Sequence, residues 1–161
     1  MKRRRETQTA MGIAYSCDKD KGVSYEVWEG LVSGSDWVQH VRRQVADRNW
    51  PAGDKSLTDV RLVSLNSAIG DADLEEVGAI YRAQTKKISS SRAAVVASKE
   101  FRFCQLYHVF TSRHGMRVIV FNNFALACKW LGLDAKDAEQ SIVRLRTRLV
   151  GETSRQPPAS P

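Results

Sequence analysis

The sequence predicts an α/β domain built on a mixed five-stranded sheet, packed by about four helices and followed by an extra C-terminal helix. The apolar residues 117–121 lead directly into a short helical pattern that stops at Gly132, which is a strand-to-helix unit. Residues 92–98 begin a second unit of this kind. Near the start of the chain, two alternating runs joined by a glycine-containing loop indicate a β-hairpin. A hairpin followed by βα units predicts a sheet that is antiparallel at one side and parallel at the other.

The composition is ordinary for a soluble globular domain. The chain has 161 residues, of which 42% are hydrophobic and 27% charged, so one packed domain with tails is expected. No apolar run approaches the roughly 20 residues that span a bilayer. The basic residues 2–5 are not followed by the apolar stretch of a secretory signal. We therefore expect a cytoplasmic protein with no membrane span.

More than half of the net charge of +7 comes from the basic residues 2–5 near the N-terminus. Four of the positive charges lie in residues 2–5, and removing them leaves +3 for the rest. Such a cluster can attract nucleic acid by counterion release, although a solvated terminus is its more common origin. The predicted organisation is a basic disordered tail (1–10), an α/β domain (11–133), an additional C-terminal helix (134–150) and a disordered tail (151–161).

The hairpin and the first helix come first in the chain. In the second hairpin strand Val23, Tyr25 and Val27 alternate with Ser24 and Glu26, the period of a half-buried strand. A helix capped by Ser35 or Asp36 follows. Its apolar face is formed by Trp37, Val38, Val41 and Val45, and its polar side includes His40, Arg42, Arg43, Asp47 and Arg48.

Three further strands and three helices complete the predicted domain. Residues 57–63 form a short strand, and a helix beginning at Asp71 or Asp73 buries a stripe of Leu74, Val77, Ile80 and Tyr81. The continuous apolar residues 93–97 suit a strand covered on both faces. The helix after Ser98 has an apolar side of Phe101, Cys104, Tyr107 (or Val109) and Phe110. The strand at 118–121 leads to a helix capped by Asn122 or Asn123 that carries Phe124, Ala127, Trp130 and Leu131.

The additional helix begins at Asp134 and has a narrow apolar stripe. The stripe consists of Ala138, Ile142, Leu145 and Leu149, while Arg144, Arg146 and Arg148 occupy other faces. A stripe of this width either docks on the domain or pairs with a second copy of the chain, so a homodimer through this helix is one expectation.

This order of elements resembles the STAS-like domains, the fold of bacterial anti-sigma-factor antagonists and of the STAS/SEC14 group. The segments that carry the resemblance are 25–30, 47–53, 57–61, 93–97, 118–121 and 125–132. The last of them contains the pattern Ala-x-x-Trp-Leu-Gly at 127–132, which is similar to many short bacterial members. The resemblance covers about residues 11–133 and rests on structural motifs.

The resemblance implies a regulatory module that works by binding and not by catalysis, acting through a protein partner or a small molecule. In antagonist members, the loop after the third strand carries a phosphorylated serine in a pattern like Asp-Ser-Ser-Gly. The matching residues 64–70 are Ser-Leu-Asn-Ser-Ala-Ile-Gly, with Ala68 at the serine position. The phosphoswitch is therefore not carried over, and Ser64 and Ser67 are candidates by proximity alone.

The remaining residues favour no catalytic, cofactor or metal site. The only close pair for nucleophilic chemistry is Cys104 with His108, four residues apart on one helix, where packing is the more common reading. The other histidines are His40, and His114 at a helix end. The glycines match no phosphate-binding loop, and Cys17, Cys104 and Cys128 have neither zinc nor disulfide spacing. We expect all three cysteines in the core.

We therefore expect a non-enzymatic module that binds a protein partner or a small apolar ligand. The predicted interaction surface comprises Ser64, Asn66, Ser67, Gly70, Asp71, Leu74, Phe103 and Tyr107. An alternative is a nucleic-acid-binding accessory protein that uses the basic N-terminal tail and the arginines of the C-terminal helix.

Overall fold

A computed structural model describes residues 12–50, 55–65, 69–98, 104, 108, 111–112 and 115–153. In this part of the chain a five-stranded sheet has the order β1-β2-β3-β4-β5. The strands are β1 (Gly12–Asp18), β2 (Val23–Val32), β3 (Lys55–Leu65), β4 (Arg92–Val96) and β5 (Arg117–Phe121). The described helices are α1 (Gly34–Ala46), α2 (Asp71–Ala83), α3 (Thr85–Ile88), α5 (Phe124–Leu131) and α6 (Ala135–Thr153). Cys104, His108, Thr111 and Ser112 are also helical, after Ser98 as predicted.

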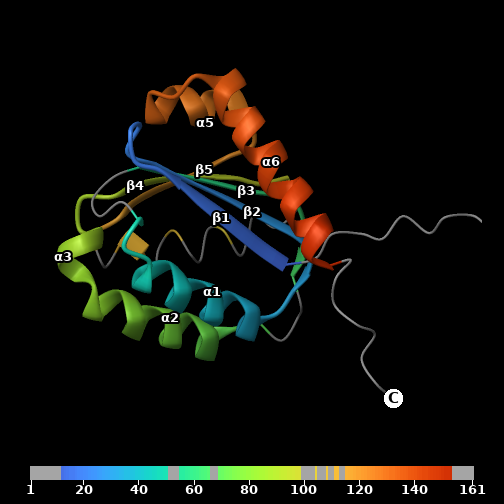
Figure 1. The fold of residues 1–161 in the computed structure, drawn as a ribbon. Coiled ribbons are helices and arrows are strands. Elements are labelled where there is room, and N and C mark those ends of the chain that lie inside the picture. The colour runs from blue at the N-terminus through green and yellow to red at the C-terminus, as the bar shows by residue number, and fades with distance from the viewer. Residues whose placement is uncertain are drawn as a thin grey trace, which may run out of the picture.

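The sheet is mixed, as predicted. β1 pairs with β2 antiparallel, and the other neighbouring strands pair parallel. Figure 1 shows α1, α2 and α3 on one face of the sheet and α5 and α6 on the other. Because helices cover both faces, β2 is buried on both sides over residues 23–29, whereas its sequence pattern predicts a half-buried strand. β3 is buried at Leu57, Asp59 and Val60 and exposed at Leu62 and Ser64.

Each face of the sheet has its own apolar core. On the α1/α2 face, Trp28, Trp37, Val41, Val77 and Tyr81 pack together with Val95 and Val118. On the α5/α6 face, Val23, Tyr25, Val27 and Leu57 pack with residues of both helices. Alternate residues of β2 thus serve the two cores, which is why the strand has a period of two although both faces are buried.

Helix ends follow local side-chain chemistry, with one correction. Ser33, and not Ser35 or Asp36, caps α1: its Oγ accepts from Asp36 N–H at 3.2 Å. Asp36 completes a capping box by accepting from Ser33 N–H at 2.9 Å. Asn123 caps α5 by accepting from Leu126 N–H at 2.9 Å. α2 begins at Asp71 as predicted, and Asp73 accepts from Gly70 N–H at 3.1 Å.

The predicted apolar stripe of the C-terminal helix is confirmed as a packing surface. Ala138, Ile142, Leu145 and Leu149 of α6 are buried in the second core, against β1 and β2. The stripe therefore docks on the domain, which is the first of the two arrangements predicted for it. The helix extends to Thr153, three residues past the expected end. Of the helices that the structure describes, none combines the length and apolar character that crossing a membrane requires.

Candidate functional site

The predicted interaction surface is only partly described. Ser64, Gly70 and Asp71 are exposed, and Leu74 packs partly against the first core. Asn66, Ser67, Phe103 and Tyr107 lie outside the described residues. The four described positions come from the end of β3 and the start of α2, and their role in binding stays a prediction.

A cavity lies between the sheet and α1, on the α1/α2 face. Its volume is about 60 Å³, enough for a small molecule or a few waters. Four aromatic residues form part of its wall: Trp28, Trp37, Trp50 and Tyr81. Trp28, Trp37 and Tyr81 are buried, and Trp50 packs against the core from the segment after α1. An aromatic wall around an open volume is typical of small-molecule sites.

The floor of the cavity is open because the strands carry small residues there. The parallel register aligns Ser24 of β2 with Ser56 of β3, and Ser56 with Ala93 of β4. All three residues line the cavity. The next row on this face is larger: Glu26, Thr58 and Val95 are aligned in the same way. A row of two serines and one alanine thus leaves space that valines would fill.

A buried polar cluster forms one side of the cavity. Glu26 accepts from Trp28 Nε1–H at 2.5 Å and from Gln44 Nε2–H at 3.0 Å. Its Oε2 also lies 2.9 Å from His40 Nε2. His40 is 1% exposed; its Nε2 is paired with Glu26, and its Nδ1 has no hydrogen-bond partner among the described residues. Buried polar atoms without partners are rare, and this ring lines the cavity.

The Glu26 carboxyl is held in its charged form. Burial by itself raises the pKa of a carboxyl, but the His40 imidazole and the donors Trp28 and Gln44 outweigh this effect. The net result is a pKa of Glu26 below its ordinary value. The cavity therefore contains a carboxylate at neutral pH, beside the His40 imidazole.

The sequence interpretation placed these residues wrongly. The sequence predicts His40 on the polar side of the first helix and Glu26 as a polar residue of a half-buried strand, but both side chains are buried. His40 and Gln44 lie three and seven residues after Trp37, on the same face of α1 as Trp37 and Val41. That spacing is the signal that would have found them.

The structure describes both members of the candidate pair, Cys104 and His108. His108 Nδ1 is hydrogen-bonded to the carbonyl oxygen of Val118, on β5. Cys104 is buried and lines the cavity. His114 lies outside the described residues. Of the other cysteines, Cys128 is buried in the second core and Cys17 is half-buried, so only Cys17 departs from the predicted core position.

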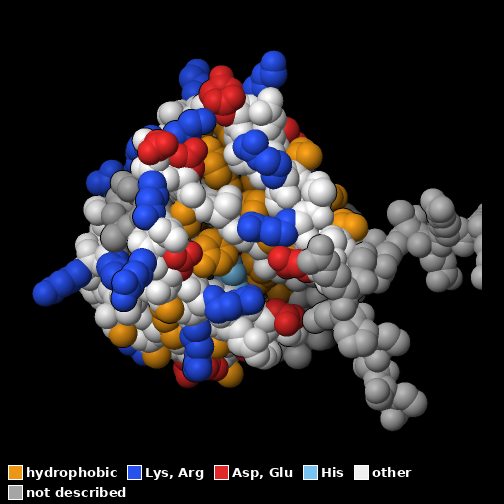
Figure 2. Space-filling model, viewed as in Figure 1, with side chains coloured by type: hydrophobic (Ala, Val, Ile, Leu, Met, Phe, Trp, Pro, Cys, Tyr) orange, Lys and Arg blue, Asp and Glu red, His pale blue; other side chains and the backbone are white. Residues whose placement is uncertain are grey.

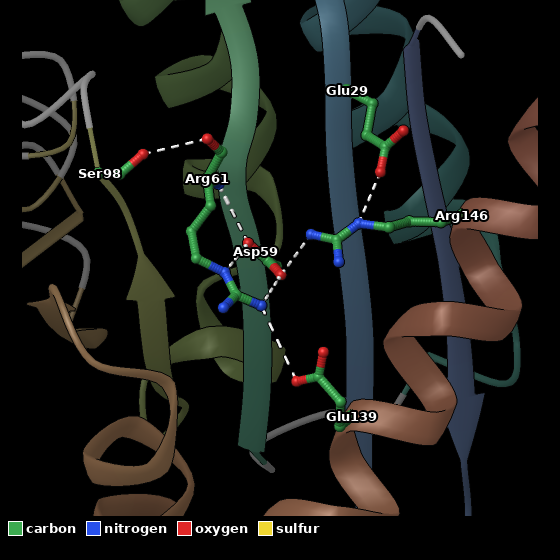
Figure 3. Close-up of polar contacts among 6 residues, drawn as sticks. All are labelled: Glu29, Asp59, Arg61, Ser98, Glu139 and Arg146. Atoms are coloured by element: carbon green, nitrogen blue, oxygen red, sulfur yellow. Dashed lines mark hydrogen bonds and ion pairs between the residues drawn. The ribbon is translucent and has the colours of Figure 1, made fainter. Parts of the chain in front are cut away.

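A second polar cluster lies on the α5/α6 face of the sheet, on the other side from the cavity, and joins α6 to the sheet (Figure 3). Asp59 of β3 is fully buried and accepts from Arg61 Nη2–H at 2.7 Å and from Arg146 Nη2–H at 2.6 Å. Arg146 Nε lies 2.6 Å from Glu29 Oε1, and Arg61 Nη2 lies 3.9 Å from Glu139 Oε2. The cluster has two arginines and three carboxylates and cross-links β2, β3 and α6.

This cluster removes Arg146 from the predicted nucleic-acid surface, whereas Arg144 and Arg148 are exposed. Arg146, assigned to an outer face of the helix, points toward the sheet. Arg148 donates to the Tyr15 carbonyl oxygen at 2.7 Å, and Arg144 donates to Ser141 Oγ at 3.2 Å. Figure 2 shows Lys and Arg side chains spread over one face with acidic side chains between them, without a continuous basic stripe. Among the described residues, no group of His, Cys, Asp and Glu has the arrangement of a metal site.

Comparisons with known proteins identify the fold. No family model matches the chain, and no curated protein matches it. A solved structure similar to this chain is that of an uncharacterized protein from the DUF3478 family with a SpoIIAA-like fold, from Shewanella loihica PV-4. The TM-score is 0.52 at 15% sequence identity, covering 80% of this chain and 98% of that chain. The chain therefore has a SpoIIAA-like fold, which confirms the predicted STAS-like architecture.

Proposed function

We propose that this protein is a non-enzymatic binding module that holds a small molecule in the cavity between α1 and the sheet. The observation that supports this is the buried His40 ring beside the Glu26 carboxylate, in the wall of an open volume, with a ring Nδ1 that has no hydrogen-bond partner among the described residues. A ligand in the cavity would supply the missing partner and would fill space that the small residues of the floor leave open. The expected protein-binding surface at Ser64–Gly70 has no comparable unsatisfied group among its described residues.

The tryptophans offer a test of this proposal. The chain has four tryptophans: three line the cavity, and Trp130 packs on Phe121 in the opposite core, with ring centroids 5.9 Å apart. Each indole N–H gives its own signal in a ¹⁵N–¹H NMR spectrum. A panel of small neutral, cationic and anionic organic molecules is added in turn to the labelled protein.

Binding in the cavity shifts the indole signals of Trp28, Trp37 and Trp50 and leaves that of Trp130 in place. A panel in which no molecule moves the cavity signals, or in which all four move together, would contradict the proposal. Changes confined to the backbone signals of Ser64, Gly70 and Asp71 would instead favour the surface predicted from the sequence.

A further inference from the structure

The wall of the cavity has the chemistry of a site for positive charge. Tryptophan and tyrosine rings attract cations to their faces, and three indoles and one phenol ring line this volume. Trp28 and Trp37 lie against each other with ring centroids 6.2 Å apart. The Trp28 indole N–H is turned to Glu26. These rings stand beside a carboxylate, so the aromatic and the ionic contributions act on the same volume.

The charges around the cavity favour a cation over an anion. Among the described lining residues, the groups that can carry charge are Glu26, His40 and Lys55. The Lys55 ammonium points to the α5/α6 face of the sheet. Its Nζ lies 3.9 Å from the position that a Cβ on Gly132, at the end of α5, would occupy. Glu26 is therefore the one acidic side chain among the described lining residues, and its carboxylate faces the aromatic wall.

The polar groups also retain free capacity. A carboxylate has about four acceptor sites on its two oxygens, and Glu26 uses three of them, for Trp28, Gln44 and His40. The hydroxyl groups of Ser24 and Ser56 stand in the adjacent row and can also accept. A ligand with several N–H donors on one atom matches this set of acceptors.

From this combination we propose that the cavity binds a small organic ammonium ion, with the ammonium group at Glu26 and the hydrocarbon part against the tryptophan and tyrosine rings. The inference rests on the proposed function and adds the class of ligand to it. A volume of about 60 Å³ suits a small aliphatic amine. The aromatic rings and the carboxylate together distinguish an ammonium ion from a neutral or anionic molecule of equal size.

Isothermal titration calorimetry with three molecules of matched size tests the ligand class: ethylammonium, ethanol and formate. The full chain is titrated at neutral pH and constant ionic strength. Ethylammonium is expected to bind at least about tenfold more tightly than either of the others. Ethanol or formate binding as tightly as ethylammonium would overturn the ammonium assignment while leaving the binding function intact. A second contrary result is that ethylammonium gives no binding heat while other molecules of the NMR panel shift the cavity indole signals. That result would likewise overturn the ammonium assignment and leave the binding function intact.

Two variants locate the site. Glu26→Gln removes the charge from the cavity and is expected to reduce the preference for ethylammonium over ethanol to a few-fold. Glu139→Gln makes the same change on the α5/α6 face, in a half-exposed carboxylate, and is expected to leave the preference unchanged. An equal loss in both variants, or none in Glu26→Gln, would overturn the site. Should Glu26→Gln fail to fold, as judged by its Trp130 signal, the comparison of the three molecules on the unchanged chain still decides the ligand class.

Discussion

Glu26 shows how single residues set the properties of the cavity. Its carboxylate is enclosed by Trp28, His40 and Gln44, so its charge depends on neighbours and not on water. Removing one member of a buried charged pair usually costs more than the pair contributes, because the remaining group is left without compensation. The same arrangement makes stability depend on pH.

The pKa of Glu26 is lowered from an ordinary value of 4.5 by its folded surroundings, although burial opposes this. A carboxyl with a depressed folded pKa stabilises the protein above its unfolded pKa, and this contribution is lost as the pH falls through the folded value. Glu26→Gln is therefore expected to be less stable than the natural chain at neutral pH, by about 2 kcal/mol. The difference should shrink below about pH 4.5. Urea unfolding of both chains across this range checks this, and a pH-independent difference would refute it.

The cysteine thiols are expected to be slow nucleophiles. Burial and the nearby Asp47 carboxylate raise the pKa of Cys17 to about 11, and burial with acidic neighbours raises the pKa of Cys128 to about 11. Since the thiolate is the reactive form, alkylation by iodoacetamide should be slow at neutral pH. Its rate at Cys17 should rise with pH up to about 11, with Cys128 protected by complete burial in addition. Peptide mass spectrometry follows each site, and rapid labelling of Cys17 at neutral pH would contradict the raised pKa.

At the scale of elements, α6 belongs to the domain core. Its apolar stripe closes the α5/α6 face, and Arg146 fixes it to Glu29 and Asp59. Breaking this attachment exposes the apolar side chains of β2 and β3 that it covers.

Ile142 and Val143 give a matched pair on α6. Ile142 is fully buried and Val143 is 49% exposed. Ile142→Ala should lower the free energy of unfolding by about 2–5 kcal/mol, because it leaves a cavity in the second core. Val143→Ala should change it by no more than about 0.5 kcal/mol. Chemical denaturation of both variants is the measurement. Equal effects would show that α6 is not packed on the sheet in this register.

Two glycines should respond in opposite directions to alanine. Gly132 ends α5 with φ of +68°, a left-handed conformation that costs an L-residue about 1 kcal/mol. Gly151 lies within α6 with no atom within 4 Å of an added Cβ, where alanine is expected to stabilise the helix by about 0.5 kcal/mol. Thermal unfolding should therefore show a lower midpoint for Gly132→Ala and a slightly higher one for Gly151→Ala. A higher midpoint for Gly132→Ala would rule out the left-handed helix end.

At the scale of the whole molecule, patterns of neighbouring residues in the sequence predicted the architecture. The candidate site depends instead on contacts between residues that are far apart in the sequence. The helix at Asp71, the glycine stop at Gly132 and the stripe of α6 depend on nearby residues, and the sequence indicated all three. The environments of Glu26 and Arg146 depend on which strands pair and where α6 docks. Periodicity alone cannot show that a strand with polar alternate residues is covered on both faces.

The cavity itself follows from parallel pairing. Ser24, Ser56 and Ala93 are far apart in the sequence and become a row of small side chains only through the register of β2, β3 and β4. The SpoIIAA-like fold fixes the strand order, but the likeness to the solved structure extends to the fold alone. The binding role therefore rests on these residues of the chain.

The central claim is that the cavity between α1 and the sheet holds one small molecule. Native mass spectrometry tests it on the full chain and on two variants, after incubation with the panel molecule that shifts the cavity indoles most. Ala93→Val fills the floor of the cavity, and Ser64→Val makes a comparable addition at an exposed position of β3. We predict one bound molecule per chain in the natural protein and in Ser64→Val, and none in Ala93→Val. A bound molecule retained by Ala93→Val, or one lost in Ser64→Val alone, would contradict the account.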